Sequence, residues 1–543
     1  MLSSKIRVPY TKNEPVKMYA PGSPEKESLK KELEYLKGQK FEIPVIIGGK
    51  EIKTGNMGKC VMPHDHAHVL GEYHMAGEKE IAMAIESALE ARKEWAEMPL
   101  QARVAIFRKA ADLLAGPWRD RLNAATMLSQ SKNAFQAEID SAAELIDFWR
   151  YNPYYAMELY EEQPDSQDGM WNYVEYRPLE GFIFAVTPFN FTSIAGNLPT
   201  APALMGNVVV WKPASSAVYS AYMLMKLLEE AGVPAGVINF IPGSGRKVGP
   251  MVMEHEDFSG VHFTGGTNTF LGMWETIGKN IAKYKTYPRI VGETGGKDFI
   301  FVHETAKVDA VVTAMARGAF EFQGQKCSAA SRAYLPKGMW AEVKQKLVAE
   351  VETMKMGDTT DFTNFINAVI DANAFRDITG YIDYAKAADD AEIICGGTYD
   401  DSKGYFIRPT VILTDNPKFK TMQEEIFGPV LTVYLYDEDK YEETLHLCDE
   451  TSPYALTGAI MGTDRYAINK AFKILRNAAG NFYINDKPTG AVVGQQPFGG
   501  SRASGTNDKA GSKANLMRWV STRTVKETFV PPTNYRYSFL NEK

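Results

Sequence analysis

The hydrophobic and polar positions of this 543-residue chain divide it into an N-terminal helical part and a longer part in which strands alternate with helices. Near the N-terminus, apolar residues recur every three or four positions among charges, which predicts amphipathic helices at 78–98, 101–114 and 137–151. A further helix is expected to begin after the N-cap Ser23 and to end at Gly38.

Short apolar runs separated by helical patterns begin near residue 182. Buried strands are expected at 182–186, 208–211, 237–241, 261–263, 299–302, 331–335, 411–413 and 431–436. Strands that alternate with helices form parallel sheets, so we expect two α/β domains in series.

Two segments with strand patterns, 171–177 and 520–530, have no obvious partner in their own domains. We therefore expect β-ribbon material near 165–180 and 520–535. Unpaired main-chain groups at a strand edge are unfavourable or bind other chains, so we predict that these strands pair across subunits in a symmetric dimer.

The composition indicates a soluble globular protein, with 45% hydrophobic and 23% charged residues. The net charge is −7 without a basic block, so we expect no nucleic-acid partner. The uncharged stretch 181–211 contains several prolines and asparagines, which argues against a membrane-spanning helix. Residues 1–10 lack the apolar core of a secretory signal peptide, and four scattered cysteines suit a reducing compartment.

Two glycine-rich turns follow predicted strands and open predicted helices. The turn at 242–249 has the spacing G-x-G-x-x-x-G, one residue longer than the dinucleotide fingerprint, and fits a plain strand-to-helix turn equally well. In the turn at 263–267, backbone amides at a helix N-terminus could face a phosphate. Two such turns among parallel strands favour a nucleotide site.

Three residues could carry nucleophilic chemistry. Cys327 lies in the glycine-flanked motif GQKCSA, where access and a field that favours thiolate would make it a nucleophile; otherwise it is a core cysteine. Glu293 directly follows an apolar strand and is either desolvated enough to act as a base or a solvated loop residue. Asn190 offers a neutral amide to an oxyanion, or occupies a turn.

The segment His64-Asp-His-Ala-His68 would place three imidazoles on one face of a strand. No second cluster of ligands lies nearby in the sequence, so we expect no metal. The chain also lacks the G-x-S-x-G, H-E-x-x-H and Walker motifs, which argues against the hydrolases and NTPases that carry them.

Six motifs, in their order, resemble the aldehyde dehydrogenase superfamily. They are TPFN ending at Asn190, WKP from Trp211, FTGG from Phe263, ETGGK from Glu293, GQKC ending at Cys327 and EEIFGP from Glu424. The resemblance covers essentially everything after Ile43. The segments 137–148 and 481–500 resemble more narrowly one branch of that family, which oxidises the semialdehyde formed from Δ1-pyrroline-5-carboxylate.

The resemblance implies an aldehyde dehydrogenase-like α/β fold in three parts. A Rossmann-type NAD-binding domain would comprise 1–163 and 182–294, and an α/β catalytic domain would comprise 295–505. A β-ribbon oligomerisation element would comprise 164–181 and 506–543.

The implied function is NAD-dependent oxidation of L-glutamate γ-semialdehyde to L-glutamate, the second step of proline catabolism. Cys327 would attack the aldehyde, and Asn190 together with the Cys327 main-chain N–H would hold the oxyanion. Glu293 would activate the water that releases the acid. The partners would be a small-molecule substrate and a second copy of the chain, in a homodimer or higher homo-oligomer. The location would be the cytoplasm of a bacterium or the mitochondrial matrix of a eukaryote, with no signal peptide or transmembrane segment.

The resemblance also assigns the cofactor NAD to a set of residues. Lys212 would contact the adenosine ribose, Glu425 the nicotinamide ribose and Phe427 the nicotinamide ring. The remaining cofactor residues would be Thr187, Gly265, Gly266, Thr267, Asn268 and Thr269. Ser215 stands where many members carry a Glu that repels a 2′-phosphate, so NADP remains an alternative.

For the substrate, the resemblance assigns the α-carboxylate to Ser328 and to the backbone of Gly490 and Ala491. The methylenes would lie between Phe191 and Phe498, whose alternative is ordinary core packing, and Glu144 would shape the pocket. Two other functions stay open: a different semialdehyde dehydrogenase without the 489–491 anchor, and a catalytically silent homologue. The second would not need to keep the thiol, the base and the amide together.

Overall fold

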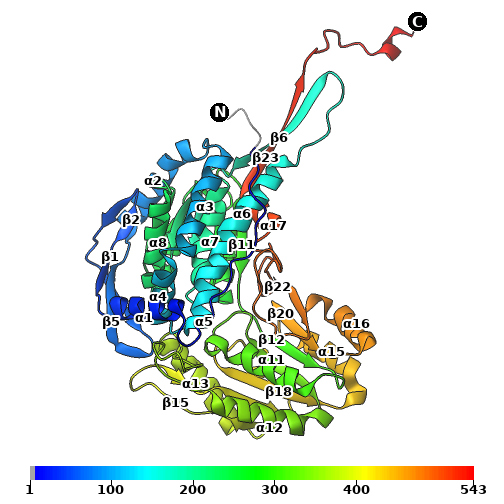
Figure 1. Cartoon of the computed structure of the whole chain (residues 1–543). Helices are drawn as coiled ribbons and strands as arrows, with labels where there is room; N and C mark the ends of the chain where they lie inside the picture. The colour runs from blue at the N-terminus through cyan, green and yellow to red at the C-terminus, as the bar shows by residue number, and fades with distance from the viewer. Residues whose placement is uncertain (1–5, 543) are drawn as a thin grey trace.

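A computed structural model describes residues 6–542, so half of the segment 1–10 lies outside the described residues. Two seven-stranded sheets, each with helices on both faces, form separate halves of the molecule, and a two-stranded ribbon rises from the first half (Figure 1). The expected α/β class is therefore confirmed.

The first sheet has the strand order β11-β10-β7-β8-β9-β2-β3. Strands β7 to β11 are parallel to their neighbours, and β2 and β3 add an antiparallel edge. Their bounds are β2 Val45–Ile47, β3 Lys50–Ile52, β7 Phe182–Val186, β8 Val208–Lys212, β9 Ile238–Phe240, β10 Phe258–Thr264 and β11 Arg289–Glu293. Nearly continuous apolar runs suit these strands because helices bury both faces of a parallel sheet.

Ten helices of the first half surround this sheet. They are α1 Pro24–Lys37, α2 Glu78–Trp95, α3 Leu100–Ala115, α4 Arg119–Gln130, α5 Ala134–Ala137, α6 Glu144–Glu161, α7 Thr192–Leu204, α8 Val218–Ala231, α9 Gly245–Met253 and α10 Thr267–Asn280. The predicted start of α1 is confirmed, since the Ser23 hydroxyl accepts a hydrogen bond from the Lys26 N–H. The uncharged stretch 181–211 forms β7, α7 and β8.

The prediction of one continuous α-helix at 137–151 is wrong. A π-helical turn, Glu138–Ala143, separates α5 from α6. This turn buries Glu138 and Asp140, which accept hydrogen bonds from Arg119 and Lys132. A π-turn shifts the helical register by one residue, so the charged residues point inward here rather than to solvent.

The second sheet has the order β14-β17-β18-β13-β12-β20-β21 and is parallel except at β14. The strand bounds are β12 Asp298–Val302, β13 Ala330–Pro336, β14 Ala391–Cys395, β17 Thr410–Thr414, β18 Val430–Tyr436, β20 Thr457–Met461 and β21 Asn481–Ile484. The helices of this half are α11 Val308–Phe320, α12 Lys337–Thr353, α13 Ala372–Ala387, α14 Lys420–Gln423, α15 Tyr441–Glu450 and α16 Arg465–Ile474, whereas the short helix α17, Lys513–Met517, packs against the core of the first half. One core packs α11 and α12 on one face of the sheet, and another packs α13, α15 and α16.

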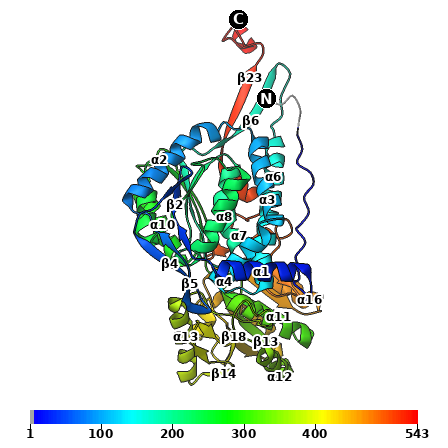
Figure 2. The same cartoon turned by 60° about the vertical axis from the view of Figure 1, so that its left-hand side comes forward.

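The ribbon consists of β6 (Met170–Pro178) and β23 (Val520–Thr528), which pair with each other antiparallel along their full lengths. The sequence showed no obvious partner for either strand in its own domain, but each is the partner of the other, far away in the sequence. Figures 1 and 2 show the far part of the ribbon standing clear of both halves. On the outer edge of β6, the Gln163 side chain bonds the main chain of Val174, and the Ser166 hydroxyl accepts from the Asn172 N–H. Among the described residues, no strand pairs with the outer edge of β23.

Smaller sheets complete the fold. They are formed by β1 Phe41–Ile43 with β4 Met57–Met62 and β5 Asp65–His74, by β15 Tyr399–Asp400 with β16 Phe406–Ile407, and by β19 Tyr454–Ala455 with β22 Ser501–Arg502. Within residues 6–542, no helix combines the length and the apolar character that crossing a membrane requires.

Candidate active site

The candidate residues of the first half gather at one edge of its sheet. Asn190 follows β7, Lys212 ends β8, the turn Gly265–Gly266 follows β10, and Glu293 ends β11. These strands are parallel neighbours, so their carboxyl ends share one edge, where ligands of open α/β sheets bind. The sequence scattered these residues over about a hundred positions, and the topology brings them together.

The loop before Cys327 has an unusual backbone. After α11, Phe322 and Gln323 have positive φ angles of 50° and 54°, and Gly324 has φ +67°. A side chain on Gly324 would also collide with the Gly428 carbonyl, so glycine is required there. The Asn190 side-chain amide donates to the Gln325 carbonyl over 3.0 Å, which fixes the amide beside the nucleophile loop.

Cys327 differs from the other cysteines of the chain in its exposure. Cys60, Cys395 and Cys448 are buried, whereas Cys327 is half-buried and therefore accessible. The expected field that favours thiolate is wrong for this structure. Burial, reinforced by the carboxyl groups of Asp298, Glu293 and Glu425, raises the pKa of the thiol well above its usual value. Attack by Cys327 thus needs a proton acceptor or a cation brought in by a ligand.

Glu293 is not a solvated loop residue. Its carboxylate accepts a hydrogen bond from the Gly500 N–H over 3.0 Å, and its backbone bridges to Gly505. Burial raises the pKa of Glu293 well above its usual value, against a smaller lowering by the Gly500 N–H and Lys509. A carboxyl group with a raised pKa is suited to proton transfer near neutral pH.

Lys212 lies where a cofactor phosphate or sugar could reach it. Its ammonium is buried and donates to one acceptor, the Pro213 carbonyl, over 2.9 Å, and burial lowers its pKa to about 8. A side chain on Gly245, in the first glycine-rich turn, would come within 3.8 Å of this ammonium. At the second turn, Gly266 begins α10 without a side-chain cap, and nothing lies within 4 Å of where its side chain would be. The second turn thus leaves open space beside backbone donors, and the first turn lies against the Lys212 side chain.

Glu425 occupies a cradle formed by the glycines of the ETGGK motif. Its carboxylate accepts from the Gly296 N–H over 2.9 Å, and a side chain on Gly295 would collide with it. Burial raises its pKa to about 7. Phe427 has a φ of 56° and meets Phe189 edge-on, with ring centroids 5.8 Å apart.

The other predicted cofactor residues lie at the same sheet edge. The Thr187 hydroxyl accepts from the Trp211 indole over 3.0 Å. Thr267 accepts from the Gly295 N–H over 3.2 Å, linking α10 to the ETGGK motif. Asn268 and Thr269 are exposed on the first turn of α10.

The predicted carboxylate anchor adjoins the nucleophile. The hydroxyls of Ser328 and Thr489, 161 positions apart, lie 2.8 Å from each other. Gly490 has a φ of +97°, and the Lys487 ammonium donates to the Thr489 carbonyl over 2.9 Å. The loop that leads through Gly490 to Ala491 is therefore held beside Cys327.

The remaining substrate candidates approach from the first half and from the C-terminal segment. Phe191 is half-buried with the Lys132 ammonium 4.5 Å from its ring centroid. Phe498 is half-buried and pairs its backbone with Ala510. Burial and the Asp140 carboxylate raise the pKa of Glu144 to about 7, and its carboxylate accepts from the Ser193 hydroxyl.

A cluster of buried charges, which no motif in the sequence signals, lies behind Phe191. The Lys132 ammonium donates to Asp140 over 2.6 Å, and the Lys326 ammonium lies 3.5 Å from the same carboxylate. Both lysines are buried. Lys132 follows Ser131 in a polar turn, which carries no sequence signal for burial. For Lys326, the signal is its position directly before Cys327.

The three imidazoles of the His64–His68 segment do not converge. His64 contacts the Ser131 hydroxyl at 2.6 Å, His66 the Asp401 carbonyl at 2.8 Å and His68 the Lys37 carbonyl at 3.0 Å. Across the described part of the chain, no group of three or more His, Cys, Asp or Glu side chains could hold a metal ion.

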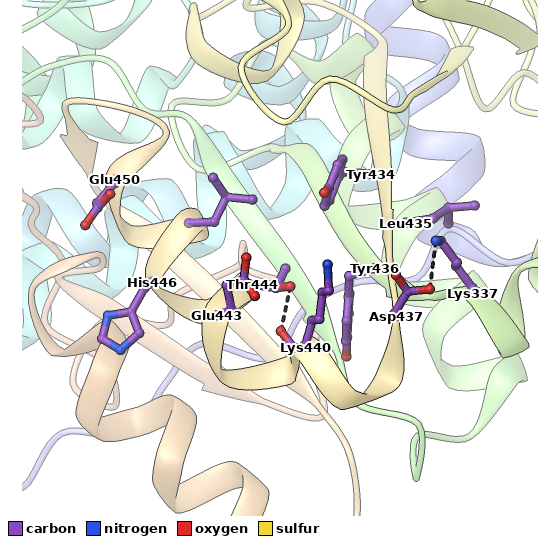
Figure 3. Close-up of a pocket in the computed structure, with 11 residues that line it drawn as sticks. Lys337, Tyr434, Leu435, Tyr436, Asp437, Lys440, Glu443, Thr444, His446 and Glu450 are labelled. Carbon is purple, nitrogen blue, oxygen red and sulfur yellow. Dashed lines mark hydrogen bonds and ion pairs between the residues drawn. The ribbon is translucent and has the colours of Figure 1, made fainter.

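A hollow of about 350 Å³ lies away from these residues, between the end of β18 and α15 (Figure 3). Its lining carries both charge signs, including the ion pair of Lys337 with Asp437 at 2.7 Å. It contains none of the candidate site residues, and we assign it no role.

Comparison with known proteins shows the relationship. The model of the aldehyde dehydrogenase family matches residues 52–525. The mitochondrial Δ1-pyrroline-5-carboxylate dehydrogenase of Dictyostelium discoideum is 54% identical over 540 residues, 99% of this chain and 97% of that protein. The human mitochondrial enzyme of that name is 47% identical over 97% of this chain and 94% of its own length.

Solved structures agree with the sequence comparison. The crystal structure of the Mycobacterium tuberculosis Δ-pyrroline-5-carboxylate dehydrogenase bound with NAD matches with a TM-score of 0.96 and 50% identity over the full length of both chains. Betaine aldehyde dehydrogenase from Staphylococcus aureus, in complex with NAD⁺, matches at 0.83 and 26% identity. The strand order, the sheet edge that gathers the motifs and these similarities establish that the chain belongs to the aldehyde dehydrogenase family.

Proposed function

We propose that this enzyme oxidises L-glutamate γ-semialdehyde to L-glutamate with NAD, the activity that the names of its relatives denote. The observation that carries the proposal is the contact between Ser328 and Thr489, 2.8 Å apart. It joins the residue after the accessible thiol to a glycine loop that can bind a carboxylate. The Cys327 thiol, which would attack the aldehyde, thus has hydrogen-bond donors nearby that could bind the α-carboxylate at the other end of the substrate.

In the first half of the reaction, the Cys327 sulfur adds to the carbonyl carbon of the aldehyde and forms a thiohemiacetal. The side-chain amide of Asn190 and the main-chain N–H of Cys327 stabilise the oxyanion that develops. One hydrogen of the Asn190 amide already binds the Gln325 carbonyl, so the other is free to donate in a fixed direction.

In the second half, the carbon bound to sulfur is a thioester that water must cleave. Glu293 takes a proton from that water, the resulting hydroxide adds to the thioester, and the Cys327 sulfur leaves with the return of a proton. Glu293 must leave its bond to the Gly500 N–H or share it, and the small neighbours Gly499 and Gly500 allow that movement.

The residues at the sheet edge fit a dinucleotide. Lys212, with a single backbone acceptor, can bind the adenosine ribose, and the uncapped N-terminus of α10 at Gly266 can face the pyrophosphate. Glu425 in its glycine cradle can accept from the nicotinamide ribose, with Phe427 against the ring. Bound NAD supplies the acceptor for the hydride that leaves the thiohemiacetal carbon.

The field around Cys327 supports a cationic cofactor. The carboxyl groups of Asp298, Glu293 and Glu425 oppose the thiolate when they are ionised, and a positively charged nicotinamide ring beside them would offset that opposition. NADP remains the alternative because Ser215 offers no carboxylate to repel a 2′-phosphate.

We also propose the domain limits, the assembly and the location that the family implies. The NAD-binding domain comprises 1–163 and 182–294, the catalytic domain 295–505, and the oligomerisation element 164–181 and 506–543. Leu516 and Trp519 pack in the core of the first half, so this element is rooted there. The chain forms a homodimer through the ribbon. Its location is the cytoplasm if the source is bacterial and the mitochondrial matrix if it is eukaryotic.

The experiment that tests the function is NAD reduction across a panel of aldehydes. L-Glutamate γ-semialdehyde should give the highest kcat/KM, Cys327→Ser should abolish turnover, and Cys448→Ser should retain it. A higher kcat/KM with another semialdehyde would assign a different substrate, and near-normal turnover of Cys327→Ser would refute the mechanism.

A further inference from the structure

Asp298, the first residue of β12, is a buried acidic residue that the mechanism does not use. Its side chain is 1% exposed, and one carboxyl oxygen, Oδ1, accepts from the Thr457 N–H over 2.6 Å. Its other oxygen, Oδ2, is buried and has no hydrogen-bond partner among the described residues. An ionised carboxylate with a bare oxygen in such a place would be strongly unfavourable.

The cations beside Asp298 do not compensate it. Lys297 donates to the Ser331 hydroxyl over 2.6 Å, and the Arg332 guanidinium donates to three other oxygens, of Lys297, Tyr334 and Cys448. Neither forms an ion pair with Asp298 in the described part of the chain. A buried carboxyl group without an ion pair is expected to hold its proton.

A second unsatisfied group lies against the same point. No main-chain donor in residues 6–542 bonds the main-chain carbonyl of Cys327. A side chain built on Gly296 would collide with both this carbonyl oxygen and Oδ2 of Asp298, so the two oxygens crowd one small site. Two neighbouring acceptors repel each other unless one of them carries a proton, which can then form a hydrogen bond to the other.

We propose that Asp298 is a positioning residue of the nucleophile Cys327. As a neutral carboxylic acid, Asp298 donates a hydrogen bond from Oδ2 to the Cys327 carbonyl and places no negative charge beside the thiol. The inference rests on the proposed function, since it takes Cys327 as the nucleophile. The hydrogen bond fixes the turn that presents the sulfur, and ionisation of Asp298 both breaks it and opposes the thiolate.

The charged groups around Asp298 agree with this protonation. The groups facing it are Lys297 on its own strand, Arg332 on β13, Glu425 after α14, Cys327 in the nucleophile loop and Tyr483 on β21. Burial raises the pKa of Asp298 to about 8, aided by the Glu425 carboxylate and opposed by the Thr457 hydrogen bonds and Arg332. If Asp298 were ionised, its charge would raise the pKa of the Cys327 thiol more than that of Glu293 or Glu425.

The test is the rate of Cys327 alkylation by iodoacetamide between pH 6 and 10, without NAD or aldehyde, with the labelled peptide identified by mass spectrometry. Asp298→Asn keeps the shape and a donor but cannot ionise. It should react like the wild type below pH 7 and about tenfold faster above pH 8, the effect of one unit in the thiol pKa. The matched control Asp486→Asn, an exposed carboxylate at the end of β21, should follow the wild type throughout.

Two results would overturn the proposal. Faster alkylation of Asp298→Asn already at pH 6 would show that Asp298 is ionised in the resting enzyme. Equal rates at every pH would show that its charge does not reach the thiol. If Asp298→Asn does not fold, Asp298→Ser provides the same comparison, and the wild-type profile must itself show an inflection near pH 8. Because the assay needs no turnover, its outcome is separate from that of the aldehyde panel.

Discussion

Gly490 has a positive φ of +97° and follows Thr489, whose hydroxyl contacts Ser328. Substitution of Gly490 therefore tests how the substrate is recognised. In Gly490→Val, the new side chain would begin 2.9 Å from the Lys487 ammonium, next to the loop assigned to the α-carboxylate. Loss of a charge-assisted anchor of ~1.5–3 kcal/mol should lower kcat/KM for L-glutamate γ-semialdehyde roughly ten- to a hundredfold. A short aliphatic aldehyde such as propanal, which has no carboxylate, should lose much less.

The control separates recognition from backbone strain. Gly169, in the turn before β6, has a φ of +78° and open space around it, so Gly169→Val carries a similar strain far from the site. It should lower the melting temperature and leave both kcat/KM values nearly unchanged. Equal losses with both aldehydes in folded Gly490→Val would show that the loop supports the fold and does not read the substrate.

The charges around Glu293 predict the pH dependence of thioester hydrolysis. Glu293 must be ionised to act as a base, and its pKa is raised, so hydrolysis should accelerate as the pH rises. The Asp508 carboxylate raises this pKa and the Lys509 ammonium lowers it. Asp508→Asn should therefore shift the acceleration to lower pH, and Lys509→Met should shift it to higher pH.

The measurement is the single-turnover rate of acyl-enzyme hydrolysis as a function of pH. Both variants lose contacts, since Asp508 pairs with Arg518 and Lys509 donates to the Gly480 and Gly499 carbonyls. Melting temperatures should therefore be recorded beside the rates. Shifts of the same sign in the two variants, or no shift in either, would exclude Glu293 as the base.

The sequence indicated the chemistry of single residues better than their surroundings. Cys327, Glu293 and Asn190 could be chosen because rare motifs surround them. The field at Cys327 could not be predicted, because it depends on Asp298 and Glu425, which distant elements bring close. Burial of charge is set by tertiary packing, so no local pattern signals it.

Among the elements, the segment from β11 into the ETGGK motif depends most closely on glycine. In Gly295→Ala, the new methyl group would collide with the Glu425 carboxylate. It should displace Glu425 from its hydrogen bond to Gly296 and raise the Kd for NAD about tenfold, as titration calorimetry can measure. The control Gly278→Ala, on α10 with open space around it, should bind NAD normally and gain ~0.5–1 kcal/mol of stability. Unchanged NAD binding in Gly295→Ala would remove Glu425 from the cofactor site.

Helices and strands could be predicted from the sequence where a single pattern of apolar residues extends over the whole element. The parallel strands β7, β8 and β18 could be predicted because their apolar runs are bounded by turn residues. The π-turn at Glu138–Ala143 could not, since its register change is stabilised by contacts of Glu138 and Asp140 with residues outside the segment. The pairing of β6 with β23 was missed for a similar reason, because its register spans most of the chain.

For the whole molecule, the ribbon predicts the assembly. Its two strands pair with each other along one edge, and no other strand of the described residues pairs with the outer edge of β23, which is available to a second copy. We predict a dimer in sedimentation velocity at micromolar concentration. Trp171, exposed on β6, is expected to contribute to the interface, so Trp171→Glu should shift the protein toward monomer. Tyr466→Glu, a similar change on α16, should not. An active wild-type monomer would contradict the prediction.

The thioester on Cys327 is the central claim, and Glu293→Gln can trap it. This variant keeps the shape of the side chain but cannot take a proton from water, so the reaction should stop after reduction of NAD. Mixed with NAD and L-glutamate γ-semialdehyde, it should give one equivalent of NADH per site, and mass spectrometry should find a glutamyl group on the peptide that contains Cys327. A burst without a modified Cys327 peptide, or loss of the burst together with turnover, would contradict the account.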